Sequence, residues 1–181
     1  MWWRNSLRIV AVVAVGALNA ACFQPLYASR SFNGEKPVGA ALAQVQIERI
    51  DAPNGKPESR IAVELQEALK FEINGTEGLI SPTHVLKVRM NVGRSSIMTD
   101  ITTGRVLAEI TGIDASFVLT ELSTGKVVMR GSTTSRVSSD YPGQQQRFAR
   151  VRARLDAENR AAKVIAENVR TRVASYFVAG T

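Results

Sequence analysis

The segment from Gln144 to Phe177 contains neither glycine nor proline, the residues that most strongly oppose a helix. Apolar residues recur along it at spacings of three, four and seven, the period of one helical face. They are Phe148, Val151, Leu155, Ala162, Ile165, Val169, Val173 and Phe177. At about 1.5 Å per residue, an unbroken helix of this length spans roughly 50 Å. The pattern predicts one long amphipathic helix over 144–177.

Upstream of this helix, alternating apolar and polar residues predict strands. The clearest example is 84–92, and segments 44–50, 105–122 and 127–137 follow the same period of two. The sequence STGK at 123–126 is typical of a turn and predicts that the last two strands are antiparallel partners.

The strand expected at 105–122 changes phase midway. Apolar residues occupy even positions before Thr111 and odd positions after Gly112. An extra residue at Thr111–Gly112 would restore one buried face, so we predict a β-bulge there. In the next strand, Val127 and Met129 are expected to face the core and Val128 to face outward.

A second helix is predicted over 59–73, with Ser59 as its N-cap. The element order is then strand, helix, three-stranded meander, helix (β-α-β-β-β-α). Two helices can cover one face of a four-stranded sheet. We therefore predict an α+β two-layer sandwich over 44–181, with a mostly antiparallel sheet whose other face is polar and open.

Residues 1–21 have the composition of a secretory signal peptide. Arg4 and Arg8 precede a run of about ten apolar residues at 9–18. A membrane-spanning helix needs roughly 20 apolar residues, so a short transmembrane anchor is the weaker alternative. Cleavage would remove two arginines and no acid, lowering the net charge from +7 to +5. A basic chain favours an anionic partner, or the charge serves only solubility.

Cys22 is the only cysteine, so it can form no intramolecular disulfide and no cysteine-based zinc site. Cleavage directly before it would expose it for diacylation, whereas ordinary cleavage would leave a stray thiol in an oxidising compartment. The preceding residues resemble a bacterial lipobox, in which Ala20 and Ala21 fit and Leu18 lies one position early. We expect lipidation at Cys22, with 22–43 as a tether.

Four cations are predicted on the open face of the sheet, because residues an even number apart on a strand share a face. They are Lys87, Arg89, Arg130 and Arg136. With serine and threonine hydroxyls between them, they suit bisphosphorylated lipid A headgroups through charge-assisted hydrogen bonds. Charges that discourage edge-to-edge aggregation are an equally good interpretation.

Little in the sequence points to catalysis. His84 is the only histidine, and no phosphate-binding loop, dinucleotide motif or metal-ligand spacing is present. We expect no metal, no cofactor and no enzymatic activity. The basic residues of 147–172 are interpreted as a solvated helix face balanced by Asp156, Glu158 and Glu167. A contact with anionic lipid or nucleic acid is the other interpretation, and export argues against nucleic acid.

The sequence CFQPLY at 22–27 resembles the Cys-Gly-Phe-x-Pro-Leu-Tyr start of the lipopolysaccharide-assembly lipoprotein LptE family, as found in alphaproteobacteria, although no glycine follows Cys22 here. The similarity continues in LTELSTGKVVMRG at 119–131 and in the segment 146–177. It covers most of the chain after the signal.

The resemblance implies two helices on a four-stranded sheet and a non-enzymatic lipoprotein on the periplasmic side of the outer membrane. Phe23, in place of the aspartate typical of inner-membrane retention, implies the same location. Such a protein would sit inside the LptD β-barrel, assist its assembly and bind lipopolysaccharide. An auxiliary lipoprotein of an ABC-type envelope lipid transporter is the alternative, and a periplasmic enzyme has only export in its favour.

Overall fold

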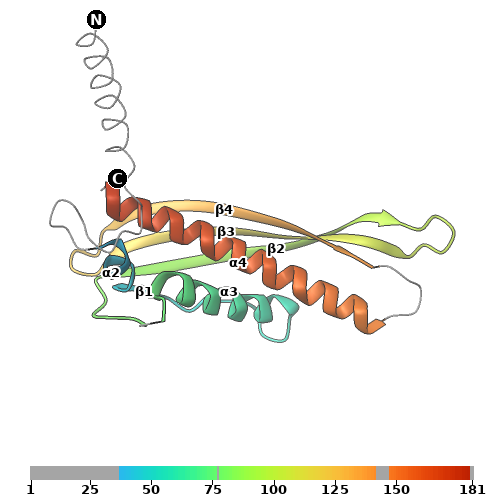
Figure 1. Cartoon of the computed structure of the whole chain (residues 1–181), viewed down its shortest axis with the longest axis horizontal. Coiled ribbons are helices and arrows are strands. Elements are labelled where there is room, and N and C mark those ends of the chain that lie inside the picture. Colours follow the sequence, from blue (N-terminus) through green and yellow to red (C-terminus); the bar gives the residue numbers. More distant parts are fainter. Residues whose placement is uncertain (1–36, 77, 142–146, 180–181) are drawn as a thin grey trace, which may run out of the picture.

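The computed structural model describes residues 37–76, 78–141 and 147–179; Cys22 and the expected signal peptide lie outside them. The elements in chain order are α2 (Val38–Leu42), β1 (Val45–Ile47), α3 (Pro57–Asn74), β2 (His84–Thr99), β3 (Val106–Glu121), β4 (Val127–Asp140) and α4 (Arg147–Ala179). The helices lie on one face of the four-stranded sheet (Figure 1). The predicted α+β two-layer sandwich is confirmed.

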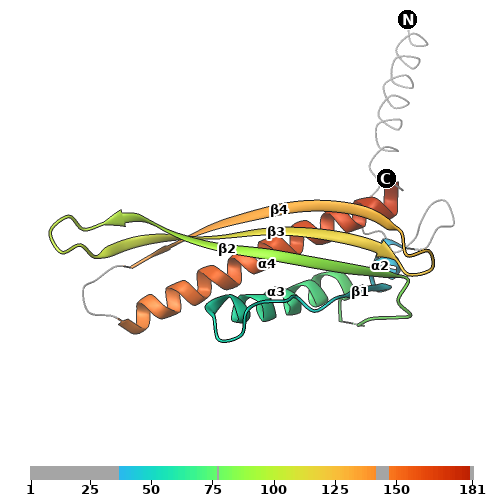
Figure 2. The same ribbon diagram turned by 180° about the vertical axis from the view of Figure 1, so that it is seen from behind.

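The sheet has the order β1-β2-β3-β4. Strand β1 is parallel to β2, and α3 provides the crossover that a parallel connection requires. The pairs β2–β3 and β3–β4 are antiparallel and are joined by short turns. Figure 2 shows these strands from the side opposite the described helices. The sheet is thus mostly antiparallel, as predicted.

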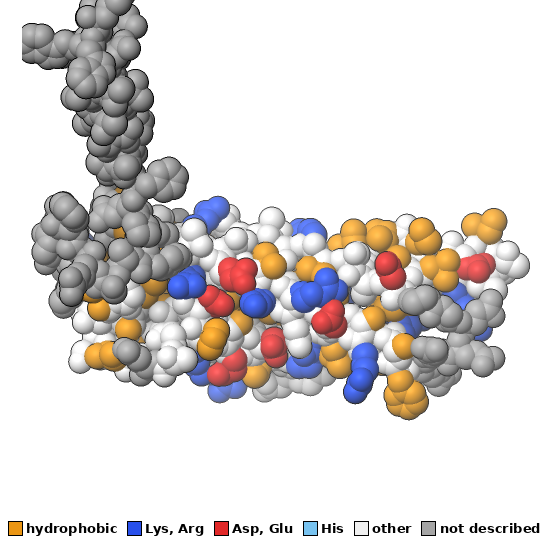
Figure 3. Space-filling view, viewed as in Figure 1, with side chains coloured by type: hydrophobic (Ala, Val, Ile, Leu, Met, Phe, Trp, Pro, Cys, Tyr) orange, Lys and Arg blue, Asp and Glu red, His pale blue; other side chains and the backbone are white. Residues whose placement is uncertain are grey.

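The long elements match in length. Strands β2 and β3 have 16 residues each, about 50 Å of extended chain, and the 33 residues of α4 make a helix of about the same length. The outward side of the helical layer carries both acidic and basic side chains (Figure 3). The molecule is therefore an elongated sandwich with a charged helical side and an open sheet side.

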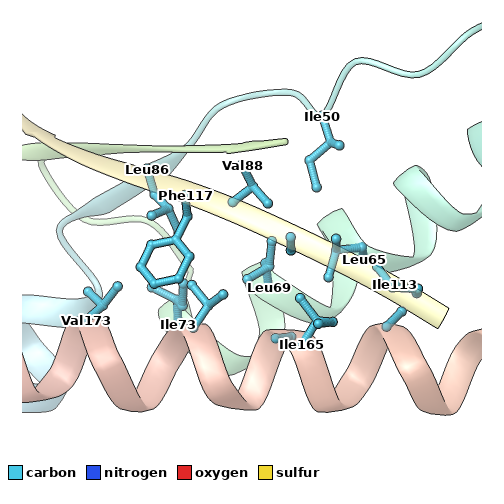
Figure 4. Close-up of a cluster of buried hydrophobic side chains, with 14 of the residues drawn as sticks. Ile50, Leu65, Leu69, Ile73, Leu86, Val88, Ile113, Phe117, Ile165 and Val173 are labelled. Carbon is cyan, nitrogen blue, oxygen red and sulfur yellow. The ribbon is translucent and has the colours of Figure 1, made fainter. Parts of the chain in front are cut away.

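The core lies between the sheet and the two long helices (Figure 4). Its largest fully buried side chains include Phe117, Ile61, Leu65, Leu69, Leu86, Ile113, Leu119 and Ile165. Each such side chain stabilises the fold by roughly 1.5–3 kcal/mol relative to exposure. The apolar stripes that predicted the elements therefore meet in one cluster.

The packed body begins before residue 44. Helix α2 places Leu42 in the core, where 2 % of its surface is exposed. Asn74 Nδ2, at the end of α3, donates to the carbonyl oxygens of Leu42 and Val45 at 3.3 and 2.9 Å. Part of the expected tether, from Val38 onward, thus belongs to the sandwich.

The β-bulge predicted at Thr111–Gly112 is wrong, because β3 pairs with both neighbours in continuous register there. The odd positions from Glu109 to Leu119 are buried against the helices, and Glu109 and Thr111 are the polar residues among them. The register shifts instead at Leu119/Thr120. Opposite this shift Val127 is exposed and Val128 packs against the core, the reverse of the prediction for these two residues, whereas Met129 packs against the core as predicted.

Both helices differ from expectation at their first turns. Helix α3 starts at Pro57, a residue well suited to the first helical position, and Lys56 is the N-cap. The prediction of Ser59 as N-cap is wrong, because its hydroxyl donates to the carbonyl of Lys56 from within the first turn. In α4 the stripe from Ala162 to Val173 is buried, whereas Phe148, Val151 and Leu155 are exposed.

Candidate functional site: an open groove on the uncovered sheet face

The strand register places the four predicted cations on the face opposite the helices. Lys87 and Arg130 flank Val118 in one row across β2, β3 and β4. Arg89 lies in the next row beside Ser116, and Arg136 lies farther along β4 beside Gly112. The intervening inward residues of β2, Leu86 and Val88, are buried. The strand parity that assigned these cations to one face therefore holds.

Two of these cations already have acidic partners. Lys87 Nζ lies 2.8 Å from Glu48 Oε1, and Arg136 Nη2 lies 2.8 Å from Asp114 Oδ1. All four side chains are about half exposed, so water screens both pairs. Within the described part of the chain, Arg89 and Arg130 have no ion pair. These two arginines can therefore bind an anion without giving up an acidic partner.

Because Gly112 has no side chain, the Arg136 side chain can lie directly on the sheet at this position. A Cβ atom at residue 112 would lie 2.9 Å from Arg136 Cδ, closer than side chains tolerate. Arg136 extends over this glycine and binds Asp114, and Thr134 donates a further hydrogen bond of 2.8 Å to the same carboxylate. The hydrogen bonds from Arg136 and Thr134 hold the pKa of Asp114 below its usual value. The carboxylate is therefore ionised at neutral pH and already engaged by Arg136.

An open groove of about 680 Å³ crosses the middle of this face. Its polar lining includes Arg89, Asn91, Ser116, Ser132, Thr134 and Arg172. Of the four predicted cations, only Arg89 belongs to the lining; Lys87, Arg130 and Arg136 lie outside it. This groove includes one cation of the predicted patch and is our candidate site.

Arg172 was not predicted for this site, because its sequence position assigns it to the long helix. Asn168 Nδ2, one turn earlier in α4, donates to Thr133 Oγ1 of β4 at 3.1 Å. This contact holds α4 beside the edge strand and brings Arg172 to the groove. Helical periodicity alone carries no signal for such a placement.

The groove combines two guanidinium groups with an amide and four hydroxyls. Its one carboxylate, Asp114, is held by Arg136. Guanidinium groups bind phosphate through paired, charge-assisted hydrogen bonds, and hydroxyls and amides bind sugar oxygens. Among the described residues, no group of three or more histidine, cysteine or acidic side chains could hold a metal ion. The arrangement suits a phosphorylated, oxygen-rich ligand.

His84 lies away from the groove, at the start of β2. Its ring makes edge contacts with Tyr176 and Phe177 of α4, with centroids 6.4 and 5.1 Å apart. Partial burial, opposed by the Glu121 carboxylate, lowers the pKa of His84. The ring is therefore neutral at pH 7 and packs as an aromatic group.

The comparisons with known proteins identify the fold. No family model matches the sequence, and no curated protein matches it. A "putative lipoprotein" from Caulobacter crescentus superposes with a TM-score of 0.58 and 18 % identity, over 78 % of this chain and 96 % of that chain. The chain shares the fold of this lipoprotein.

Two further solved structures show weaker likeness. A minor lipoprotein from Acinetobacter baumannii has a TM-score of 0.44 and 15 % identity, over 76 % of this chain and 92 % of its own. Rare lipoprotein B from Shewanella oneidensis has a TM-score of 0.42 and 15 % identity, over 76 % of this chain and 95 % of its own. None of the described helices combines the length and the apolar character needed to cross a bilayer.

Proposed function

We propose that this chain is a non-enzymatic lipoprotein of the outer membrane that binds lipopolysaccharide during its insertion into the outer leaflet. It would be anchored through Cys22 and would occupy an LptD-like β-barrel whose assembly it assists. The N-terminal sequence CFQPLY and the fold shared with a lipoprotein support this proposal. The observation that carries it is the groove, in which Arg89 and Arg172 lie among amide and hydroxyl groups.

The groove would bind the headgroup of the glycolipid. Arg89 and Arg172 would take a phosphate, and Asn91, Ser116 and Ser132 would bind sugar oxygens. Lys87 and Arg130 lie one row beyond Arg89 and would extend the positive surface along the sheet. Because Lys87 is paired with Glu48, Arg130 would contribute more than Lys87 to the attraction of an anionic headgroup.

The helical side suits the aqueous interior of a barrel. Basic and acidic side chains are interspersed over it (Figure 3), as in the exposed pairs Arg160–Asp156 and Lys70–Glu67. Exposed pairs of this kind contribute little to stability but keep a surface hydrated. A polar body of this shape can fill a wide, water-lined lumen while acyl chains hold it at the membrane.

The first prediction concerns the groove. The double substitution of Arg89→Gln and Arg172→Gln should weaken lipopolysaccharide binding about tenfold, because it removes two partly screened charge-assisted contacts. Titration of the purified protein with lipopolysaccharide measures the effect. The matched control is Lys70→Gln with Lys163→Gln, which removes the same charge from the helical side. Equal weakening in both variants would show that net charge, and not the groove, determines affinity.

The second prediction concerns the anchor. Cys22→Ser should abolish labelling with palmitate and release the protein from the membrane fraction, because no other cysteine is available for acylation. Fractionation with and without radiolabelled palmitate measures both effects in one experiment. Continued labelling of the serine variant would refute acylation at this residue.

Depletion of the protein from cells, together with its co-purification from membranes, distinguishes a subunit of the lipopolysaccharide translocon from a subunit of another lipid transporter. Loss of surface lipopolysaccharide, with recovery of the protein in a complex with a large outer-membrane barrel, would support the translocon role. Misplaced phospholipid with normal lipopolysaccharide would instead support an auxiliary subunit of an ABC-type envelope lipid transporter. Recovery as a free monomer from gently solubilised membranes would count against the translocon role.

A further inference from the structure

Helix α4 extends beyond the end of α3. The two helices run side by side in the same direction, as Arg60 contacts Glu158 near the start of α3 and Glu72 contacts Arg170 near its end. The residues from Arg147 to Leu155 therefore precede the level at which α3 begins. Figure 1 shows this orange start of α4 projecting past α3. The apolar stripe of α4 continues through this overhang, and none of the described helices packs against it there.

The exposed fractions match this geometry. Phe148 is 89 % exposed, Val151 55 % and Leu155 36 %, whereas Ala162 and Ile165 of the same stripe are fully buried. Exposed apolar side chains that cluster in this way mark an interaction surface more often than isolated ones do. The overhang is thus a specific apolar feature at one end of the molecule.

The β2–β3 hairpin adds apolar side chains at the same end. Strand β4 ends opposite Ala108, so beyond this residue no third strand of the described part of the chain pairs with the hairpin. Figure 1 shows it projecting past β4 and α4. Ile97 and Met98 are more than half exposed, and Ile101 is completely exposed. We call Ile97, Met98, Ile101, Phe148, Val151 and Leu155 the apolar tip; Figure 3 shows hydrophobic side chains gathered at this end.

The turn that presents Ile101 satisfies much of its own backbone. Asp100 Oδ1 accepts hydrogen bonds from the amides of Thr102 and Thr103 at 2.8 and 2.9 Å, and the amide of Gly104 donates to the carbonyl of Asp100. Internally satisfied amides lower the cost of moving a turn into an apolar medium. The turn therefore holds Ile101 outward in an ordered conformation.

The net charge of the segments that carry the apolar tip indicates which kind of partner binds there. Segments 94–107 and 147–155 contain six arginines and a single acid, Asp100. Arg94 is paired with Glu158 and Arg154 with Glu109, and the Asp100 carboxylate interacts with Arg105, so the six arginines still exceed these three acids. Apolar side chains beside an excess of arginine are the composition of a surface that binds anionic lipid, where burial in acyl chains adds to attraction by headgroups.

We propose that the apolar tip inserts into an anionic phospholipid surface. The hairpin of the tip projects beyond β4 and α4 and carries the fully exposed Ile101 in its turn, and acyl chains deform around such a projection where a folded partner would need a matching pocket. It lies at the end of the molecule opposite Val38, about 50 Å away along the 16 residues of β2. This contact is separate from the groove on the sheet face and goes beyond lipopolysaccharide binding.

A single-site fluorophore tests insertion directly. Cys22→Ser removes the only thiol and the acyl chains, so that Ile101→Cys in this background can be labelled with an environment-sensitive dye. Vesicles of phosphatidylethanolamine and phosphatidylglycerol should shift its emission to the blue. Ser123→Cys, in the β3–β4 turn at the opposite end, is the control and should not shift. An unchanged spectrum at residue 101, or an equal shift at residue 123, would overturn the proposal.

Sedimentation with the same vesicles provides an independent measurement. Phe148→Gln should weaken binding by the acyl-free protein about tenfold, the order expected when one large apolar side chain no longer enters the membrane. Phe71→Gln is the matched control, because Phe71 is also well exposed, at 64 %, but lies on α3 outside the tip. Binding should also weaken with phosphatidylcholine alone and at high salt. Equal binding by both variants would contradict the proposal, and a result in either direction leaves the lipopolysaccharide test unaffected because these vesicles contain none.

Discussion

Glu158→Ala should lower the free energy of unfolding by about 3 kcal/mol, measured by urea denaturation. The Glu158 carboxylate is 3 % exposed and binds two arginines, Arg60 of α3 and Arg94 of β2, the latter at 2.8 Å. Truncation leaves both guanidinium groups without their acid. The Arg60 and Arg94 side chains are 40 % and 23 % exposed, so hydration of the freed guanidinium groups offsets part of the lost stability. We therefore expect a decrease in the free energy of unfolding at the lower end of the range measured for broken buried ion pairs.

Glu167→Ala is the matched control for this substitution. It removes the same side chain from the same helix, but Glu167 is half exposed and lies 3.9 Å from Lys163, so its loss should cost less than about 1 kcal/mol. A triple variant with apolar residues of similar size at positions 60, 94 and 158 should regain much of the stability, since no charge is then left unpaired. Equal losses for Glu158→Ala and Glu167→Ala would show that the buried cluster contributes nothing.

This cluster also shows where sequence patterns stop being informative. Glu158, Glu109 and Thr111 are polar and therefore look like surface positions, yet all three are buried. The two acids have partners that are distant along the chain: Glu109 accepts from Tyr141, 32 residues away, and Glu158 from Arg60, 98 residues away. Thr111 is buried by its inward position on β3, and its hydroxyl has no hydrogen-bond partner among the described residues. The polarity of a side chain therefore does not by itself predict that it is exposed. The false bulge at Thr111–Gly112 follows directly from this limit, because the two polar inward residues were assigned to the outer face.

The fold itself was predictable because each long element has one apolar face. Period-two alternation located β2, β3 and β4, and helical spacing located α3 and α4. The failures occur where tertiary position decides exposure. Phe148 and Leu155 continue the stripe of α4, but α3 begins too late to cover them. Sequence gives the stripe but not the relative offset of two helices.

The candidate site was likewise predictable where local pattern decides the position of a residue, and not where tertiary packing does. Strand parity alone puts Arg89 on the open face, and the register agrees. Arg172 depends on how α4 lies beside β4, which no local pattern encodes. Gly112 did carry a signal, since a glycine inside a strand often marks a close approach. The approaching group is the Arg136 side chain, whereas the change of apolar phase at this position had led to the wrong prediction of a bulge.

Gly131→Ala should destabilise the protein by about 1–3 kcal/mol, the usual cost of overpacking a core. Gly131 lies opposite Phe117 in the β3–β4 register, and a Cβ at residue 131 would lie 2.5 Å from the Cζ of the Phe117 ring. This ring is 1 % exposed and is enclosed by the core, so it cannot swing into solvent (Figure 4). Thermal or urea unfolding measures the loss.

Gly93→Ala is the control for this effect, because it lies in β2 and a Cβ there would meet no atom within 4 Å. It should be neutral or stabilise the protein by up to about 1 kcal/mol, since alanine restricts the unfolded chain more than glycine does. Combining Gly131→Ala with Phe117→Leu should cost less than the sum of the two single changes, because the shorter side chain leaves room for the new methyl group. Strictly additive losses would mean that the ring and the glycine do not compete for the same space, and the close packing of β4 against Phe117 would then have to be abandoned as the reason for a glycine in this strand.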